Sequence, residues 1–274
     1  MKSMRTSLSA RIRGAIALSA MLASVAVPSP AQQTYRAPKG PDGHPNLNGI
    51  WQAMNSANWD LEDHAARMGT VIAAGTLTAD PGGPGVVEGG PIPYLPAALE
   101  QKKKNFENRL NLDPEVKCYL PGSPRAPYMP YPFQIFHSAK AVFFAYQYAG
   151  AVRNIFLKDP GPAPTDTWMG QSVGRWEGET FVIENSGFDE RTWFDRAGNF
   201  HSDELKVSER FSLASADVLN YEATITDPKV YSRPWKIRMP LYRHVEKNAR
   251  LVEFKCVEFV EDLIYGDLQK KPAK

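Results

Sequence analysis

The sequence lacks the features that point to nucleic-acid, nucleotide or metal chemistry. Its 274 residues carry 32 Lys and Arg against 30 Asp and Glu, a formal net charge of +2, so no global field favours nucleic acid. The five histidines show no metal-ligand spacing, and no acidic calcium loop occurs. No glycine-rich phosphate motif follows an expected strand. We therefore expect no cofactor and no metal site.

Cysteine is nearly absent, because only Cys118 and Cys256 occur. They do not form a Cys-x-x-Cys motif, which argues against thiol redox chemistry and zinc–thiolate sites. In an oxidising compartment, a lone pair of cysteines is most simply one disulfide. We favour this disulfide over two buried free thiols, and we expect it to join the start of the folded region to its last strand.

Long apolar runs are also missing, apart from a short run near the start of the chain. Basic residues at positions 2, 5, 11 and 13 precede the apolar segment 14–27, and small residues follow up to Ala31. This pattern is typical of a cleaved signal peptide over residues 1–31; an uncleaved membrane anchor is the alternative. We expect a periplasmic or secreted protein with no transmembrane segment in the mature chain.

Proline, glycine and aromatic residues are abundant, with 23 Pro, 20 Gly and 13 Phe, as in a loop-rich β protein. Residues 32–117 form an irregular pattern, in which 58–68 and 97–110 are expected short helices. From residue 118 onward, strand-like segments follow one another at 133–137, 141–148, 152–157, 174–178, 180–186, 205–213, 218–226, 231–241 and 250–257. We expect an all-β, antiparallel lipocalin-like barrel over 118–274, with a sandwich as the alternative.

One expected strand carries a carboxylate on its apolar face. In 205–213, alternation places Glu209 with Val207 and Phe211. A carboxylate there is costly unless it is paired, and burial raises the pKa of a carboxyl group. Glu209 is therefore a candidate general acid or base, and an internal salt bridge with Arg153 is the structural alternative.

Polar side chains also interrupt the apolar faces of other expected strands. His137, Tyr146 and Tyr221 each alternate with apolar residues. Taken singly, such a residue is usually a satisfied core group. On adjoining strands, however, the three would form a polar patch inside a barrel, and together with Arg153 they are candidate substrate-binding residues.

The connection 188–204 is too long for a tight turn and combines charged with aromatic residues. His201 and the nearby Asp195 are candidate catalytic groups, with His201 as base or proton shuttle. Arg196 and Trp193 are candidate substrate-binding residues. The structural alternative is a loop fixed by its own hydrogen bonds, with His201 closing the barrel mouth.

Several motifs resemble those of a widespread family of secreted bacterial proteins without an assigned activity: PDGHPNLNGIW at 41–51, TWMGQSVGRWEG at 167–178 and DRAGNFHSDEL at 195–205. The resemblance covers nearly all of the chain after residue 31 and implies secretion, but no reaction. At the level of the expected fold, the chain is similar to the phenolic acid decarboxylases, which are small cofactor-free barrels that use tyrosines, an arginine and a glutamate. Their local motifs do not occur here, so no residue is carried over.

These observations favour a periplasmic, cofactor-independent lyase that acts on a small aromatic or phenolic compound by acid–base chemistry. In it, an arginine would hold a carboxylate or phenolate, and His201 or Glu209 would move a proton. A lipocalin-like carrier of a hydrophobic or aromatic molecule is the alternative function. A protein that binds other proteins of the cell envelope, with a filled barrel and no cavity, is the third possible function.

Overall fold

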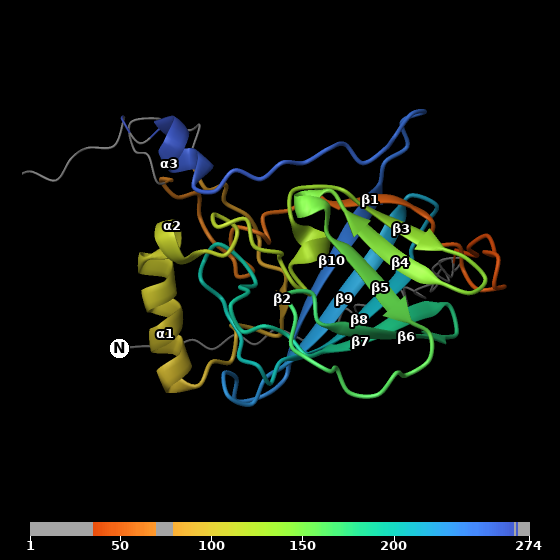
Figure 1. The fold of residues 1–274 in the computed structure, drawn as a ribbon, viewed down its shortest axis with the longest axis horizontal. Coiled ribbons are helices and arrows are strands. Elements are labelled where there is room, and N and C mark those ends of the chain that lie inside the picture. Colours follow the sequence, from red (N-terminus) through yellow and green to blue (C-terminus); the bar gives the residue numbers. More distant parts are fainter. Residues whose placement is uncertain (1–34, 70–78, 266, 268–274) are drawn as a thin grey trace, which may run out of the picture. The chain divides into compact units, whose positions relative to one another are not determined.

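Alternating apolar and polar residues form a β-sheet that closes on itself (Figure 1). The computed structural model describes residues 35–69, 79–265 and 267. Within these residues, nine strands follow one another in the order β1-β3-β4-β5-β6-β7-β8-β9-β10, and β10 pairs with β1. The predicted all-β, lipocalin-like barrel is therefore confirmed. The expected signal peptide, residues 1–31, lies outside the described residues.

The elements are short, and their bounds differ from the expected ones mainly at the ends. The barrel strands are β1 Gly49–Ala53, β3 Phe133–His137, β4 Val142–Tyr146, β5 Val152–Phe156, β6 Gln171–Glu177, β7 Thr180–Ser186, β8 Lys206–Leu213, β9 Val218–Thr226 and β10 Trp235–Arg243. The strand β2, Val87–Glu88, pairs with β10. The helices are α1 Pro96–Glu107, α2 Arg109–Leu112 and α3 Val260–Tyr265.

Strand β1 closes the barrel, because it pairs with β3 on one side and with β10 on the other. Gly49 permits this closure: its φ is 150°, and an added Cβ would lie 2.1 Å from Nη1 of Arg243. The Arg243 guanidinium donates to the Asn48 carbonyl at 2.7 Å and lies 4.1 Å from the Trp51 ring centroid. The closing strand thus comes from the expected irregular arm, 32–117, and the barrel begins before the predicted boundary at residue 118.

The barrel wall has one parallel junction, between β5 and β6. Only two residue pairs form it, Ile155 with Ser172 and Phe156 with Val173. The other neighbouring strands of the barrel are antiparallel. A parallel connection cannot be a tight hairpin, so residues 157–170 cross over from the end of β5 to the start of β6. We call this junction the seam.

Residues 250–257 form no strand, so the predicted last strand is wrong. The pairing of β10 with β1 has already closed the sheet, which leaves no free edge there for a further strand. The predicted disulfide is confirmed: Cys118 and Cys256 are bonded, with their Cα atoms 5.7 Å apart. The disulfide anchors a segment without strand pairing, residues 250–259, which we call the strap (Figure 1).

The barrel interior is filled mainly by aromatic side chains. Phe144 and Phe211 meet edge to face, with ring centroids 5.4 Å apart. Phe133 packs on Phe144 at 5.9 Å, and Tyr221 packs on Phe211 at 5.0 Å. All four side chains are fully buried. The interior is therefore a packed core, and any polar group on an inward face lies in an apolar setting.

Outside the barrel, one helix prediction is confirmed and one is wrong. The expected helix at 97–110 corresponds to α1 and α2. The expected helix at 58–68 is absent: its residues form turns, because Asn58 and Leu61 are buried against the connection 188–204. None of the helices in the described part of the chain is long and apolar enough to cross a membrane.

Candidate functional site

A group of polar side chains meets inside the barrel, and we call it the barrel cluster. It consists of residues from six strands: Tyr146 of β4, Arg153 of β5, Ser172 of β6, Asn185 of β7, Glu209 of β8 and Tyr221 of β9. Each occupies an inward position of its strand, as alternation with buried apolar neighbours requires. The structure therefore brings together four of the predicted site residues: Tyr146, Arg153, Glu209 and Tyr221.

Hydrogen bonds connect the cluster around the Arg153–Glu209 ion pair. Arg153 Nη2 donates to Glu209 Oε2 and to Asn185 Oδ1, and Arg153 Nε donates to Ser172 Oγ at 2.7 Å. Glu209 also accepts from Asn185 Nδ2 and from the Tyr221 hydroxyl, each at 2.7 Å. Both carboxylate oxygens are thus engaged, which offsets much of the cost of burying the charge.

Burial and charge act together on the titrating groups of the cluster. Burial lowers the pKa of the Arg153 guanidinium, but the Glu209 carboxylate more than offsets this and holds that pKa above its usual value. Burial, followed by the charge of Glu209, raises the pKa of Tyr221 well above its usual range. Burial also raises the pKa of Tyr146 to about 12. Both tyrosines therefore keep their hydroxyl protons at neutral pH.

Two polar atoms of the cluster have no hydrogen-bond partner among the described residues. They are Arg153 Nη1 and the Tyr146 hydroxyl oxygen, and both are buried. Arg153 and Tyr146 act on each other's pKa as close neighbours, and the contact between them falls short of a regular hydrogen bond. Unsatisfied buried donors are costly, and a pair of them side by side suits an acceptor that a water molecule or a small anion would supply.

The cluster adjoins the seam of the barrel. A pocket of about 300 Å³ lies there, between β5, β6 and the crossover segment. Arg153 and Ser172, which are hydrogen bonded to each other inside the barrel, both line this pocket. The pocket therefore reaches the barrel wall beside the cluster, where only two residue pairs join β5 to β6.

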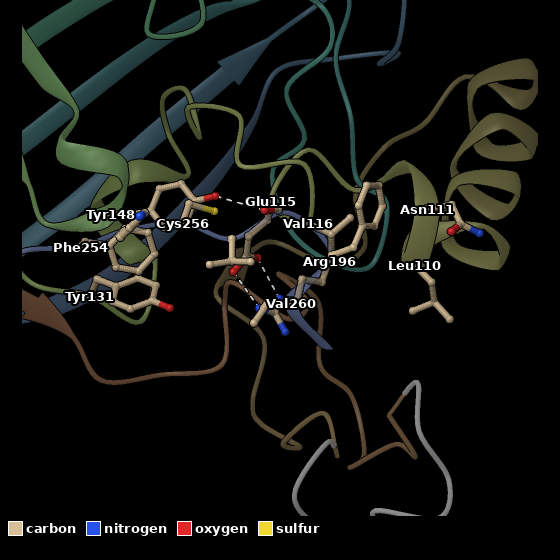
Figure 2. Close-up of a pocket in the computed structure, with 13 residues that line it drawn as sticks. Leu110, Asn111, Glu115, Val116, Tyr131, Tyr148, Arg196, Phe254, Cys256 and Val260 are labelled. Atoms are coloured by element: carbon tan, nitrogen blue, oxygen red, sulfur yellow. Dashed lines mark hydrogen bonds and ion pairs between the residues drawn. The ribbon is translucent and has the colours of Figure 1, made fainter. Parts of the chain in front are cut away.

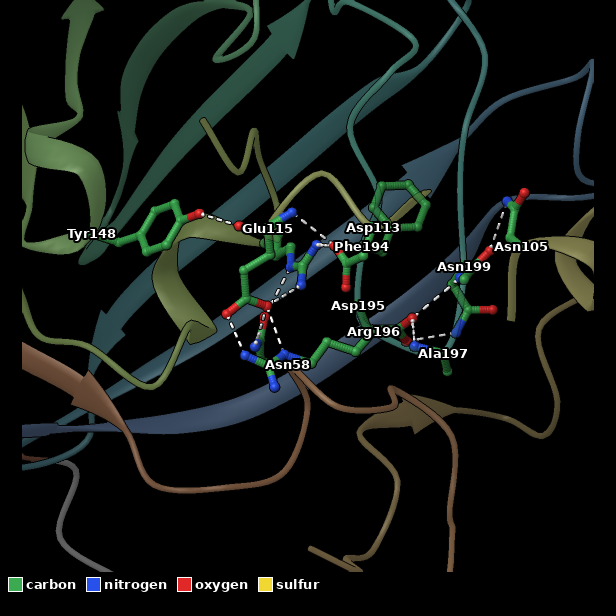
Figure 3. A network of polar contacts seen from close by, with 12 residues as sticks. Asn58, Asn105, Asp113, Glu115, Tyr148, Phe194, Asp195, Arg196, Ala197 and Asn199 are labelled. Atoms are coloured by element: carbon green, nitrogen blue, oxygen red, sulfur yellow. Dashed lines mark hydrogen bonds and ion pairs between the residues drawn. The ribbon is translucent and has the colours of Figure 1, made fainter. Parts of the chain in front are cut away.

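The connection 188–204 is organised around Asp195. This fully buried carboxylate accepts from the backbone of Leu61, Ala197 and Asn199 and from the Asn199 side chain (Figure 3). Burial, together with the nearby charge of Asp60, raises the pKa of Asp195 to about 7. Asp195 thus fixes the loop and holds residues near 61 against it.

His201 lies in the same connection, and its contacts match the structural alternative to catalysis, a loop fixed by its own hydrogen bonds. Its Nδ1 lies 2.8 Å from the Ser202 carbonyl oxygen, so Nδ1 carries the proton, and Nε2 lies 2.5 Å from the Thr192 hydroxyl. The Phe194 ring stacks on it at 5.4 Å. Burial lowers the pKa of His201, which keeps the ring neutral. Its contacts share no residue with those of Glu209.

Arg196 joins a second ion network, outside the barrel, that we call the Glu115 network (Figure 3). Arg196 donates to Glu115 twice, at 2.8 and 2.7 Å, and Arg125 donates to Glu115 at 2.7 Å and to Asp113 at 3.2 Å. Asn58 completes the set with a bond to Glu115 at 3.1 Å. Burial raises the pKa of Glu115, but the two guanidinium groups outweigh it and lower that pKa to about 2.

The last two predicted residues lie apart from both networks. His137, at the end of β3, is buried with its Nε2 2.7 Å from an Asp42 carboxylate oxygen, and its ring contacts Trp176 at 5.6 Å. Trp193 lies in the connection 188–204, opposite Phe200 in an isolated β-bridge. Neither residue contacts the barrel cluster, so their predicted role in binding substrate beside Glu209 has no support from the geometry.

Some residues of these networks were not predicted. Asn185 alternates with Phe181 and Ile183, so the signal that identified Glu209 was present for it as well. Glu115 and Arg125 lie in irregular segments without periodicity, and no pattern marks them as buried. In the described residues, no three His, Cys, Asp or Glu side chains gather in a way that would hold a metal ion.

Comparison with known proteins adds no relative to this description. No protein-family model, no curated protein and no solved structure matches the chain. The function must therefore be argued from the geometry of the sites.

Proposed function

We propose that the barrel cluster is the active site of a lyase that acts on a small aromatic or phenolic acid without a cofactor. The single observation that carries the proposal is the pair of buried, unsatisfied groups, Arg153 Nη1 and the Tyr146 hydroxyl, beside an ionisable Glu209. A substrate carboxylate would accept from both groups and satisfy them. The ring of the substrate would lie in the pocket at the seam, against Phe156 and Met169.

Decarboxylation is the most concrete form of the reaction. The bond between carbon and carboxylate breaks and CO₂ leaves, so that the electron pair remains on carbon. The Glu209 carboxylate first takes a proton from water and then gives it to this carbon, and the hydroxide that remains adds to CO₂ to form bicarbonate. Tyr221, bonded to Glu209 at 2.7 Å, positions the carboxyl group. Of the predicted catalytic residues, only Glu209 is in this cluster; His201 and Asp195 form their contacts in the connection 188–204.

The test is turnover of 4-hydroxycinnamate, followed as loss of the acid and release of CO₂. We expect Glu209→Gln to lower turnover by about 10²-fold or more, because it removes the proton carrier while keeping the shape of the side chain. Glu184→Gln, on the exposed face of β7, is the matched control and should keep wild-type turnover. Thermal unfolding of both variants checks that the fold is retained. Unchanged turnover in folded Glu209→Gln would contradict the proposal.

A carrier of an aromatic acid is the second candidate function. It is favoured by the saturation of Glu209, since both its oxygens already accept hydrogen bonds and neither is free to exchange a proton. In this case Arg153 and Tyr146 bind the ligand, and no chemical reaction takes place. Native mass spectrometry of protein purified from its host separates the two functions: a chemically unchanged acid, released on denaturation, indicates carriage.

A further inference from the structure

A second hollow lies outside the barrel, between the strap and the helical region. Its volume is about 440 Å³, within the usual range for small-molecule sites. Figure 2 shows Tyr131, Tyr148 and Phe254 gathered on one side, Leu110 and Asn111 on the other, and residues of the Glu115 network between them. None of its lining residues belongs to the barrel cluster. We call it the strap pocket.

One side of the strap pocket is aromatic. Tyr131, Tyr148 and Phe254 contact one another in all three pairs, with ring centroids 5.8, 4.9 and 5.1 Å apart. Tyr148 is held in place because its hydroxyl donates to the Glu115 carbonyl at 3.2 Å. Mutually packed rings with fixed orientation form a wall against which a planar ligand can stack at little entropic cost.

The other side carries charge with an excess of cations. Arg196 and the exposed Lys255 both line the pocket, and Glu115 is the acidic residue there. The Glu115 charge is already shared between Arg196 and Arg125. Within the described residues Lys255 forms no ion pair, so its charge is available to a ligand. This balance favours an anion at the polar side of the pocket.

The wall formed by Phe254 depends on the disulfide. Within the described residues, two backbone hydrogen bonds also hold the strap: Val252 N–H donates to the Gln147 side chain at 3.2 Å, and Phe259 N–H donates to the Val116 carbonyl at 2.8 Å. The Cys118–Cys256 bond lies between these two contacts in sequence and fixes Phe254 two residues away. Without the bond, the strap would lose its central anchor and the aromatic wall would lose one of its three rings.

We propose that the strap pocket is a binding site for a planar aromatic anion, independent of the barrel cluster, and that the Cys118–Cys256 disulfide holds it in its binding form. The aromatic part of the ligand stacks on the wall of Tyr131, Tyr148 and Phe254. Its carboxylate lies toward Lys255, because Arg196 already donates twice to Glu115. Oxidised protein binds the ligand, and reduced protein binds it weakly.

Isothermal titration of the oxidised protein with 2-naphthoate and with uncharged 2-naphthamide tests the site. We expect one naphthoate at the strap pocket, and weaker binding of the amide by about two- to fivefold, as for an exposed ionic contact. Phe254→Ala should weaken naphthoate binding by about tenfold, because it removes an aromatic anchor at the surface and leaves the barrel core intact. Lys255→Met should abolish the preference for the anion, and Lys140→Met, in the distant β3–β4 turn, should not.

The redox part is tested by the same titration after reduction and with the double variant Cys118→Ser, Cys256→Ser. Both should lose about tenfold in affinity for naphthoate. Equal affinity in oxidised and reduced protein overturns the role of the disulfide. Absence of saturable naphthoate binding, or equal binding by Phe254→Ala, overturns the site itself.

Two cross-experiments separate this site from the proposed active site. Tyr146→Phe, which removes a proposed carboxylate donor of the barrel cluster, should bind naphthoate like the wild type, and Phe254→Ala should keep the wild-type turnover of 4-hydroxycinnamate. If naphthoate binding is weakened in Tyr146→Phe but kept in Phe254→Ala, the anion binds in the barrel and the strap pocket is not its site.

Discussion

The barrel cluster and the Glu115 network place the same two groups, a carboxylate and a guanidinium, in different surroundings. Arg153 and Glu209 lie within an aromatic core, with side-chain exposures of 1% and 0%. In the Glu115 network, Arg196 is 28% exposed and Glu115 has a second guanidinium partner in Arg125. In the barrel, Arg153 is the one cation that pairs with Glu209. In the outer network, Glu115 pairs with two cations, so removing one of them leaves its charge balanced by the other.

The most direct test of this difference between the two networks is to remove one arginine from each. Arg153→Met leaves Glu209 as a buried charge without a cation, and we expect a loss of about 3–5 kcal/mol in the free energy of unfolding. Arg196→Met should cost about 1 kcal/mol, because Arg125 and Asn58 still bind Glu115 and the site is partly hydrated. Urea unfolding of both variants measures the difference. Equal losses would show that the two networks are energetically alike.

Low pH should weaken the Glu115 network, because its stability depends on a carboxylate that two cations hold in the ionised form. Its pKa in the folded protein is about 2, below the ordinary value of 4.5. A depressed carboxyl pKa stabilises the fold above pH 4.5, and this stability is lost as the pH falls toward 2, by about 3 kcal/mol in all.

Urea unfolding at pH 5, 4, 3 and 2 tests this expectation. Glu115→Gln should start less stable than the wild type but lose less on acidification. Glu184→Gln, at the surface of β7, is the matched control and should follow the wild-type curve. If Glu115→Gln and the wild type show the same slope between pH 4.5 and 2, Glu115 does not carry the effect.

The smallest expected effect concerns a single hydrogen bond of the barrel cluster. Tyr221→Phe removes the hydroxyl that donates to Glu209 at 2.7 Å and should cost about 1–2 kcal/mol, since the bond is buried and charge-assisted. Tyr242→Phe, on the outward face of β10 with 42% exposure, should change stability by less than about 0.5 kcal/mol. Thermal unfolding at a fixed pH measures both. A neutral Tyr221→Phe would mean that Glu209 finds another donor.

Strand alternation predicted much of the fold and four of the six residues of the barrel cluster. It identified Glu209 and Arg153 as inward residues because each interrupts an apolar face. The salt bridge between them, given as the structural alternative for Glu209, is present, although β5 and β8 are not neighbours and meet only across the closed barrel. The same alternation would have identified Asn185.

Other features had no signal of this kind. The Glu115 network is built from irregular segments, whose burial follows from tertiary packing and not from a period in the sequence. His201 and Asp195 looked catalytic because charged and aromatic residues are dense in their loop. Their hydrogen bonds are those of a loop that fixes its own backbone. The strand expected at 250–257 does not form, because β1, which is five residues long, already pairs with the edge of β10.

The closure by β1 also has a kinetic consequence. Asn48 and Arg243, which are hydrogen bonded across this junction, are 195 residues apart in the chain. Contacts between residues so far apart in the chain form late, because closing a very long loop costs conformational entropy before the contact can stabilise the fold. β10 follows β9 closely in the chain and pairs with it over eight residue pairs, so until it docks on β1 the unpaired edges that another chain can extend are those of β1 and β10. The barrel should therefore be most prone to aggregate in the interval between the assembly of β3 to β10 and the docking of β10 on β1.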